Sequence, residues 1–143
     1  MPAFKAVIDT SVMVSVAFAK QGLAKQLKDM IADEDFMLVA SKKILKELYQ
    51  VMHYPRIIKR FSPSEDDINE FIGLIVEKAL ITEGHYRADG ITDDPADDMF
   101  LACALEAKAD YIVSGDPHLG DLNHFYGTQI VDVTTFIKKV KEK

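Results

Sequence analysis

Short apolar runs that stop at a carboxylate are the feature that most restricts how this chain can fold. Residues 4–8 (FKAVI) lead directly into Asp9, and residues 111–113 (YIV) lead through Ser-Gly into Asp116. A β-branched run that ends in a polar cluster is typical of a strand buried on both faces of a parallel sheet. An ionised Asp9 beside such a strand is destabilising unless other groups stabilise it, so its presence requires a reason.

Two more apolar runs, residues 36–40 and 128–133, have the same strand-like pattern. Segments with helical spacing separate the four runs. We expect Thr10 or Ser11 to cap a helix after the first run, and a second helix over 23–31 with Leu23, Leu27, Met30 and Ile31 on one side. Further helices are expected over 41–54, 62–80, 94–109 and 135–143. Residues 83–93 are polar, hold two glycines and are expected to form a loop.

Three of these helices begin with recognisable capping signals. The helix at 41–54 should end before Pro55, because the residue that precedes a proline avoids the helical region. The helix at 62–80 has a proline at its first position and a glutamate placed for a capping box. The expected caps are Ser41, Ser62 (with Pro63 and Glu65) and Asp94.

Strands that alternate with helices predict parallel pairing, right-handed crossovers and a three-layer α/β/α architecture. A length of 143 residues with 48% hydrophobic content is typical of a single domain, here 1–143. In sheets of this kind, ligands bind beyond the carboxyl ends of the strands. Asp9 and Asp116 are therefore expected to lie at one shared edge.

Composition restricts the location and the partners of the protein. No apolar run reaches the roughly 18 residues that a membrane span needs, and the start lacks the basic leader of a signal peptide. The single cysteine, Cys103, leaves no intramolecular disulfide and favours a reducing, cytoplasmic compartment. The formal charge of −6 has the wrong sign for binding nucleic acid through bulk electrostatics, so the placement of the acids decides the function class.

Two further carboxylates lie on apolar helix faces rather than on solvated ones. At helical spacing, Glu47 falls between Ile44 and Val51, and we expect it to point toward the sheet. Asp97 shares its face with Leu101 in the same way.

Each acid also has a simpler interpretation when it is taken alone. Asp97 and Asp98 suit the first turn of a helix, where carboxylates stabilise the dipole, and Asp116 suits a turn or the cap of a short helix. Together, however, four close anions would take up protons unless a cation lay among them. Mg²⁺ or Mn²⁺ satisfies an oxygen-only set of ligands, whereas scattered histidines and a single cysteine disfavour zinc. The proposed ligands are Asp9, Glu47, Asp97 and Asp116.

A hard metal held by carboxylates at an open edge suits phosphodiester hydrolysis, because it lowers the pKa of bound water and neutralises charge on the phosphoryl group. The GxxxxGK[ST] loop of nucleoside triphosphatases is absent. A phosphatase with Asp9 as nucleophile, like the haloacid dehalogenase group, would need a second aspartate where this chain has Ser11. A non-catalytic binding module with a degenerate site is the third interpretation.

Four segments of the chain resemble a PIN domain, and specifically the VapC-like toxins of prokaryotic toxin–antitoxin pairs. The segments occur in the same order as in that family. They are VIDTSV, SxxILKEL, DPADDMFLACAL and ADYIVSGD. The resemblance implies a parallel sheet of four to five strands in the order 3-2-1-4-5 and a Mg²⁺- or Mn²⁺-dependent endoribonuclease. It implies catalytic and metal-binding roles for Asp9, Glu47, Asp97 and Asp116, with Thr10, Ser11, Asp98 and Ser114 in support. Many relatives carry another aspartate where this chain has His118, which leaves one or two metals open.

An RNA substrate must be held by local basic groups, since the net charge repels a phosphate backbone. Each candidate also suits a solvated surface position. The resemblance further implies a small antitoxin protein as partner and a homodimer, for which the helix at 62–80 is a candidate surface. The RNA-binding candidates are Lys42, Lys43, Lys46 and Arg56, followed by Lys59 and Arg60.

Overall fold

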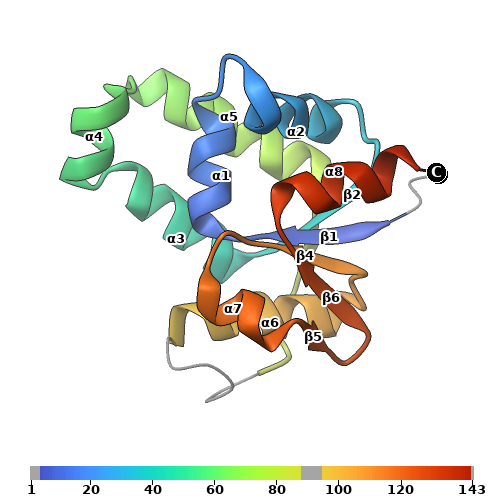
Figure 1. The fold of residues 1–143 in the computed structure, drawn as a ribbon. Coiled ribbons are helices and arrows are strands. Elements are labelled where there is room, and N and C mark those ends of the chain that lie inside the picture. The colour runs from blue at the N-terminus through green and yellow to red at the C-terminus, as the bar shows by residue number, and fades with distance from the viewer. Residues whose placement is uncertain (1–3, 88–94, 143) are drawn as a thin grey trace.

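A computed structural model of the chain describes residues 4–87 and 95–142, apart from the side chains of Pro95, Ala96, Pro117, His118 and Asp121. Its centre is a six-stranded sheet in the order β3-β2-β1-β4-β6-β5 (Figure 1). All neighbouring strands are parallel except β5, which runs antiparallel to β6. The strands are β1 (Lys5–Ile8), β2 (Met37–Ser41), β3 (Leu80–Thr82), β4 (Tyr111–Val113), β5 (His124–Phe125) and β6 (Thr128–Val131).

Helices cover both faces of the sheet, with α6 and α7 on one side and α1, α2 and α8 on the other (Figure 1). Alternate residues of β1 enter two separate cores: Ala6 and Ile8 join one, and Val7 joins the other. This two-sided burial is why β1 carries no polar residue between Ala6 and Ile8. The helices are α1 (Thr10–Ala17), α2 (Gly22–Ala32), α3 (Lys42–Met52), α4 (Pro55–Phe61), α5 (Glu65–Lys78), α6 (Pro95–Ala107), α7 (Pro117–Leu122) and α8 (Val133–Lys141).

The expected α/β/α layers and the strand order 3-2-1-4 are confirmed. Two strands were not expected. Residues 80–82 continue the apolar spacing of the preceding helix, but the chain leaves the helical region at Ala79 (φ −87°, ψ 149°) and pairs with β2 as β3. The antiparallel strand β5 has only two residues, too few to carry a readable pattern.

The helix predicted over 62–80 is wrong at its start. Ser62 is the C-cap of α4 in the left-handed region (φ 47°), and Ser64 is the N-cap of α5. Ser64 accepts from the N–H of Asp67, whose carboxylate accepts in return from the N–H of Ser64 (both 3.0 Å). Pro55 is the first residue of α4, a short helix between α3 and α5. No element was predicted for these residues.

Other helix expectations have mixed outcomes. Ser41 caps α3 as expected, through a bond from the N–H of Ile44 (3.2 Å). In α2 the expected inward residues Leu27, Met30 and Ile31 are buried, but Leu23 is 44% exposed. The expected cap at Asp94 and residues 88–93 of the expected loop lie outside the described residues.

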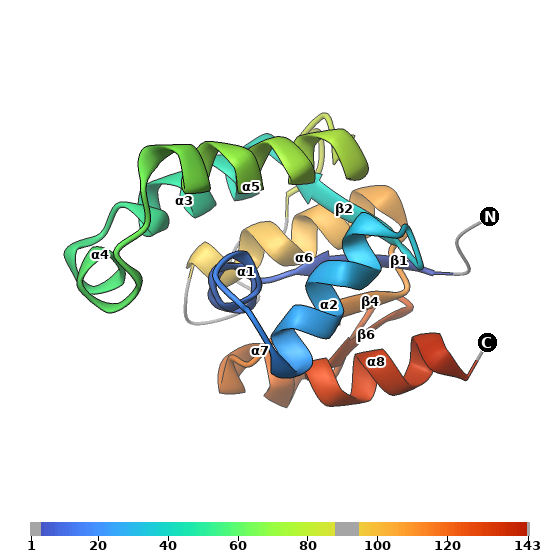
Figure 2. The same ribbon diagram turned by 90° about the horizontal axis from the view of Figure 1, so that it is seen from above.

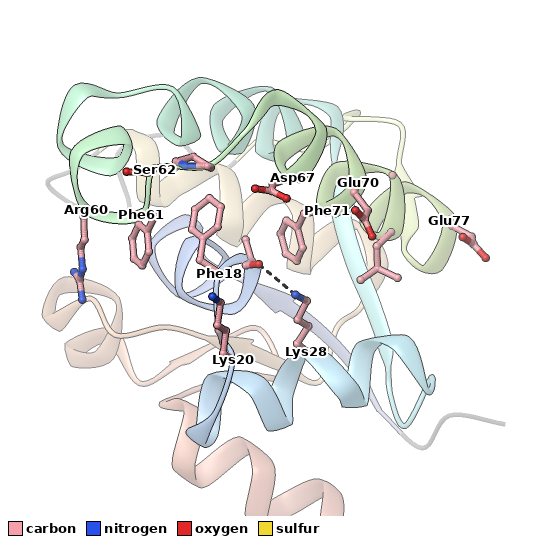
Figure 3. A pocket seen from close by; sticks show the side chains of 15 residues that line it. Phe18, Lys20, Lys28, Arg60, Phe61, Ser62, Asp67, Glu70, Phe71 and Glu77 are labelled. Atoms are coloured by element: carbon pink, nitrogen blue, oxygen red, sulfur yellow. Dashed lines mark hydrogen bonds between the residues drawn. The ribbon is translucent and has the colours of Figure 1, made fainter.

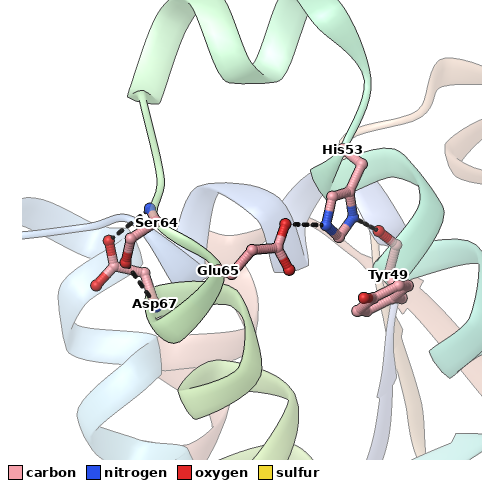
Figure 4. A network of polar contacts seen from close by, with 5 residues as sticks. All are labelled: Tyr49, His53, Ser64, Glu65 and Asp67. Atoms are coloured by element: carbon pink, nitrogen blue, oxygen red, sulfur yellow. Dashed lines mark hydrogen bonds and ion pairs between the residues drawn. The ribbon is translucent and has the colours of Figure 1, made fainter.

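A histidine joins α3 and α5, the helices on either side of α4. Figure 2 shows α4 at the end of the molecule opposite to the chain termini. In His53, Nδ1 lies 2.8 Å from the carbonyl oxygen of Tyr49 and Nε2 lies 2.7 Å from a carboxylate oxygen of Glu65 (Figure 4). Both partners are acceptors, so both bonds form only when the ring carries two protons. These bonds raise the pKa of His53, the carbonyl contributing most.

None of the helices in the described part of the chain is both long enough and apolar enough to span a bilayer.

Candidate active site

Asp9 lies between β1 and α1, at the carboxyl edge of the sheet. Its N–H donates to the carbonyl oxygen of Val113 (3.0 Å), which joins the ends of β1 and β4. Its side chain accepts from the N–H of Val12 (2.9 Å), so Asp9 itself caps α1 and the cap expected at Thr10 or Ser11 is wrong.

Asp132 performs the same capping task at the end of β6 and shows what is unusual about Asp9. It accepts from the N–H of Thr135 (2.8 Å) and is exposed, and this bond lowers the pKa of Asp132. Asp9 is only 4% exposed, and burial raises the pKa of Asp9 against the opposing effect of its hydrogen bonds. Serine or asparagine would cap α1 without placing a charge in the interior. Capping therefore explains the position of Asp9 but not its carboxylate.

Ser114, the residue after β4, links Asp9 to Asp116. Its hydroxyl donates to the second carboxylate oxygen of Asp9 and accepts from the N–H of Asp116 (2.9 Å). The hydroxyl of Ser11 donates to the first oxygen of Asp9 (3.3 Å). Asp116 is half-buried and precedes α7, where its carbonyl oxygen accepts from the N–H of Gly120 (2.9 Å).

Glu47 reaches the same edge from α3. Its side chain is half-buried, and its Oε2 accepts from the hydroxyl of Thr10 at 2.5 Å. Since Thr10 directly follows Asp9, this bond holds α3 against the start of α1. Glu47 is directed inward as expected, but its direct partner is on α1 rather than on the sheet.

Asp97 and Asp98 are both buried but face different surroundings. Asp97 lies on the face of α6 that carries Leu101, which belongs to the same core as Val7 of β1. Asp98 lines a cavity at the ends of β2 and β3 together with Ser41. Helical phase thus directs Asp97 toward the strand that carries Asp9, while Asp98 faces a neighbouring space.

The donors around these acids suit a hard cation. Within residues 4–87 and 95–142, neither Asp9 nor Glu47 has a basic side chain within ion-pairing distance, and both are held by hydroxyl or N–H groups. Across that same part of the chain, no group of three His, Cys, Asp or Glu side chains is close enough to hold a metal alone. Mg²⁺ commonly uses one or two protein carboxylates, with waters and phosphate oxygens as its remaining ligands. The residues present therefore suit Mg²⁺ or Mn²⁺ in an open arrangement.

One large hollow in the described structure does not coincide with these acids. It has a volume of about 1070 Å³ and lies between the far end of α1 and helices α4 and α5 (Figure 3). Phe18 and Phe61 stack in it with ring centroids 4.8 Å apart. The eight residues of α1 separate it from Asp9 by about 12 Å of helix.

Sequence reasoning missed the smaller cavity beside Asp98, of about 330 Å³. Tyr86 and Glu106 line this cavity but come from a polar segment and from an ordinary helix face. No spacing rule connects them, because the carboxylate of Glu106 binds backbone N–H groups rather than a side chain.

Comparisons with known proteins agree with the family and the fold. A model of the PIN domain family matches residues 5–118. The uncharacterised protein MJ1680 of Methanocaldococcus jannaschii is 27% identical over 115 residues, which are 80% of this chain and 72% of that protein. The structure of PAE2754 from Pyrobaculum aerophilum has a TM-score of 0.64 at 13% identity, covering 99% of this chain and 92% of that one. VapBC2 from Rickettsia felis, solved with a DNA fragment from its promoter, has a TM-score of 0.59 at 11% identity, covering 88% and 96%.

Proposed function

This chain belongs to the PIN domain family, and from that premise we propose that it is a metal-dependent endoribonuclease that hydrolyses RNA phosphodiester bonds. PIN domains are in general nucleases that use divalent metals. The observation that carries the proposal for this chain is the buried carboxylate of Asp9, held by neutral donors at the carboxyl edge of the sheet.

In the proposed site, Asp9, Glu47, Asp97 and Asp116 would hold Mg²⁺ or Mn²⁺ together with waters and phosphate oxygens. The metal would supply a water of lowered pKa and neutralise charge on the phosphoryl group. The protein's contribution is orientation, since a ligand oxygen fixed by a hydroxyl loses little freedom when it binds. The orienting groups are the hydroxyls of Thr10, Ser11 and Ser114.

Basic side chains near this edge support RNA as the substrate. Lys42, Lys43 and Lys46 are exposed on α3, the helix that carries Glu47. Arg56 is exposed on α4, and its guanidinium lies 5.5 Å from the ring centre of Tyr54. A stacked arginine of this kind can also hold a base or a phosphate.

The toxin role is a further part of the proposal. It includes an antitoxin protein that blocks the acidic edge, a homodimer with α5 as candidate surface, one domain over 1–143, and a cytoplasmic location. The likeness to VapBC2 from Rickettsia felis, a protein whose name denotes a toxin–antitoxin complex, supports the antitoxin at the level of the fold.

A catalytically weak binding module is the second candidate. It is favoured by one observation, namely that the described acids do not form a ready-made group of three. The two candidates differ in their response to metal, because an enzyme requires it for turnover and an inert module does not.

Cleavage of a labelled single-stranded RNA in Mg²⁺, in Mn²⁺ and in EDTA tests the proposal. We expect metal-dependent cutting by the wild type and loss of cutting in Asp9→Asn and Asp97→Asn. Asp132→Asn is the matched control, because Asp132 also follows a strand and caps a helix but is exposed. Full cutting by both Asp9→Asn and Asp97→Asn would refute the nuclease, and metal-independent RNA binding without cutting would favour the module.

A further inference from the structure

The cavity of about 330 Å³ lies at the same sheet edge as the acids. Its floor includes Ser41 and Thr82, the last residues of β2 and β3, which are paired in register. β2 is the neighbour of β1, whose end leads into Asp9. Adjacent strands are about 4.8 Å apart, so the cavity lies roughly 5–10 Å along the edge from Asp9.

One wall of the cavity is a face of α6 with an apolar part. Met99, Ala102 and Cys103 form the apolar part, and the same wall also includes Asp98 and Glu106. Burial raises the pKa of the Cys103 thiol to about 11, so the thiol itself is uncharged at neutral pH. The hydroxyl of Thr82 donates to the Cys103 sulfur at 3.9 Å and supplies a polar group beside the wall. Such a mixture of an apolar surface and a few polar groups is what a small ring-shaped ligand requires.

The lining also includes an aromatic ring on a fixed support. Tyr86 is 49% exposed. The segment that carries it is held by the carboxylate of Glu106, which accepts from the N–H groups of Glu83 (3.1 Å), His85 (2.9 Å) and Tyr86 (3.3 Å). An exposed aromatic on a segment held in this way loses little freedom when a flat ring stacks on it.

Both basic and acidic side chains line the cavity, and the basic ones include two lysines at the start of α3. Lys42 and Lys43 line it and form the first turn of α3, which has no acidic residue. Positive charges at a helix N-terminus oppose the dipole, so two lysines there are unfavourable for the helix itself. The other charged residues of the lining are Arg87, Glu83, Asp98 and Glu106, and the carboxylate of Glu106 is bound by backbone N–H groups. Helix stability does not explain Lys42 and Lys43, whereas binding of a phosphate does.

We propose that this cavity takes one unpaired base of a single-stranded RNA, stacked on Tyr86, while Lys42 and Lys43 hold the phosphate of that nucleotide. The inference rests on the proposed function, since it places the nucleotide next to the phosphodiester that the acids would cleave. Single-stranded RNA is the substrate class because only an unstacked base can enter the cavity.

Affinity for RNA in EDTA tests the inference without any cleavage. The probe is a short fluorescent RNA of mixed sequence, used single-stranded and as a duplex. We expect Tyr86→Ala to weaken binding of the single strand about 5- to 150-fold, the range for loss of one stacked base, and to leave duplex binding unchanged. Tyr126→Ala is the matched control, because Tyr126 is 80% exposed on the turn between β5 and β6.

The phosphate contact has its own measurement. Lys42→Ala/Lys43→Ala should lower the slope of log Kd against log salt by about 1.4 for a single strand, and Lys138→Ala/Lys139→Ala on α8 is the control pair. Ala102→Phe, which fills the cavity and keeps Tyr86, should weaken single-strand binding as Tyr86→Ala does. Equal single-strand affinities for Tyr86→Ala, Ala102→Phe and the wild type would overturn the inference.

Cleavage in Mg²⁺ is scored separately, so the two proposals fail in different ways. If the wild type cuts RNA but Tyr86→Ala binds like Tyr126→Ala, only the cavity inference is overturned. If the affinity pattern holds and the wild type does not cut, the cavity inference is supported and the nuclease is overturned.

Discussion

Replacing Asp9 by asparagine and by alanine separates its capping role from its charge. An asparagine at this position would keep an oxygen for the N–H of Val12, and its amide could donate to the hydroxyl of Ser114, which is free to rotate. It also removes a buried ionised group. We therefore expect Asp9→Asn to unfold at the same temperature as the metal-free wild type or at a higher one.

Alanine removes the cap and leaves buried partners without an acceptor. Loss of the cap costs about 1 kcal/mol, and leaving the Ser114 hydroxyl unsatisfied costs about 1–3 kcal/mol. The sum, about 2–4 kcal/mol, corresponds to a fall in Tm of roughly 5–15 °C for a chain of this size. Asp132→Ala, which removes an exposed cap, should lose only the first of these terms.

The stabilisation that bound metal gives to the wild type and to Asp9→Asn is the second measurement. Mn²⁺ at 100 times its Kd would stabilise the wild type by about 2.7 kcal/mol, and Asp9→Asn should gain much less. Thermal unfolding followed by circular dichroism, with EDTA and with Mn²⁺, measures all four proteins. A large loss of stability in metal-free Asp9→Asn, equal to that of Asp9→Ala, would refute the argument that the charge serves something other than the fold.

Three other predictions concern separate features. Glu65→Gln should reduce stability at pH 5–6 and have little effect at pH 9. The reason is that the His53 bonds are complete below the unfolded pKa of about 6.5 and are lost as pH rises through the raised pKa of the folded protein. Urea unfolding at several pH values measures this, and a difference that does not change with pH would contradict it. Cys103, 3% exposed with its pKa raised to about 11, should react with iodoacetamide at pH 8 only after unfolding, and fast labelling of the folded protein by mass spectrometry would contradict its burial. Ser64→Ala should lower the free energy of unfolding by about 1 kcal/mol, whereas Ser62→Gly should not lower Tm because Ser62 has φ 47°; the reverse order would restore Ser62 as the cap.

The layered fold was predictable because it depends on local patterns. Each central strand is buried on both faces, so residues 6–8 and 111–113 had to be apolar throughout, and that signal is visible without structure. The boundary at Ser62 was not predictable in the same way. Both Ser62 and Ser64 precede residues suited to a first helical turn, and the choice depends on where α4 ends.

The acids at the edge could be predicted from sequence where the surrounding pattern leaves no ordinary reason for a carboxylate. Asp9 follows a strand and Glu47 interrupts an apolar stripe, so both were marked by sequence. Sequence favoured Asp97 over Asp98 as a ligand because the helix face of Asp97 is the more apolar, and in the structure Asp98 lines the neighbouring cavity. The link from Ser114 to Asp9 spans 105 positions of the chain, and spacing along the sequence contains no trace of it.

The net charge does not exclude the proposed RNA partner, because charges act over a limited distance in salt solution. At physiological ionic strength, exposed charges more than about 8 Å apart are largely screened. The acidic first turn of α5 (Glu65, Asp66 and Asp67) therefore contributes to the total of −6 without opposing the phosphate that we propose Lys42 and Lys43 hold at the first turn of α3. In the proposed function, a strand of RNA would meet the exposed lysines of α3 first, and the buried acids only where a metal offset their charge. A uniformly basic surface would bind nucleic acid more tightly but would leave no set of oxygens for the proposed metal.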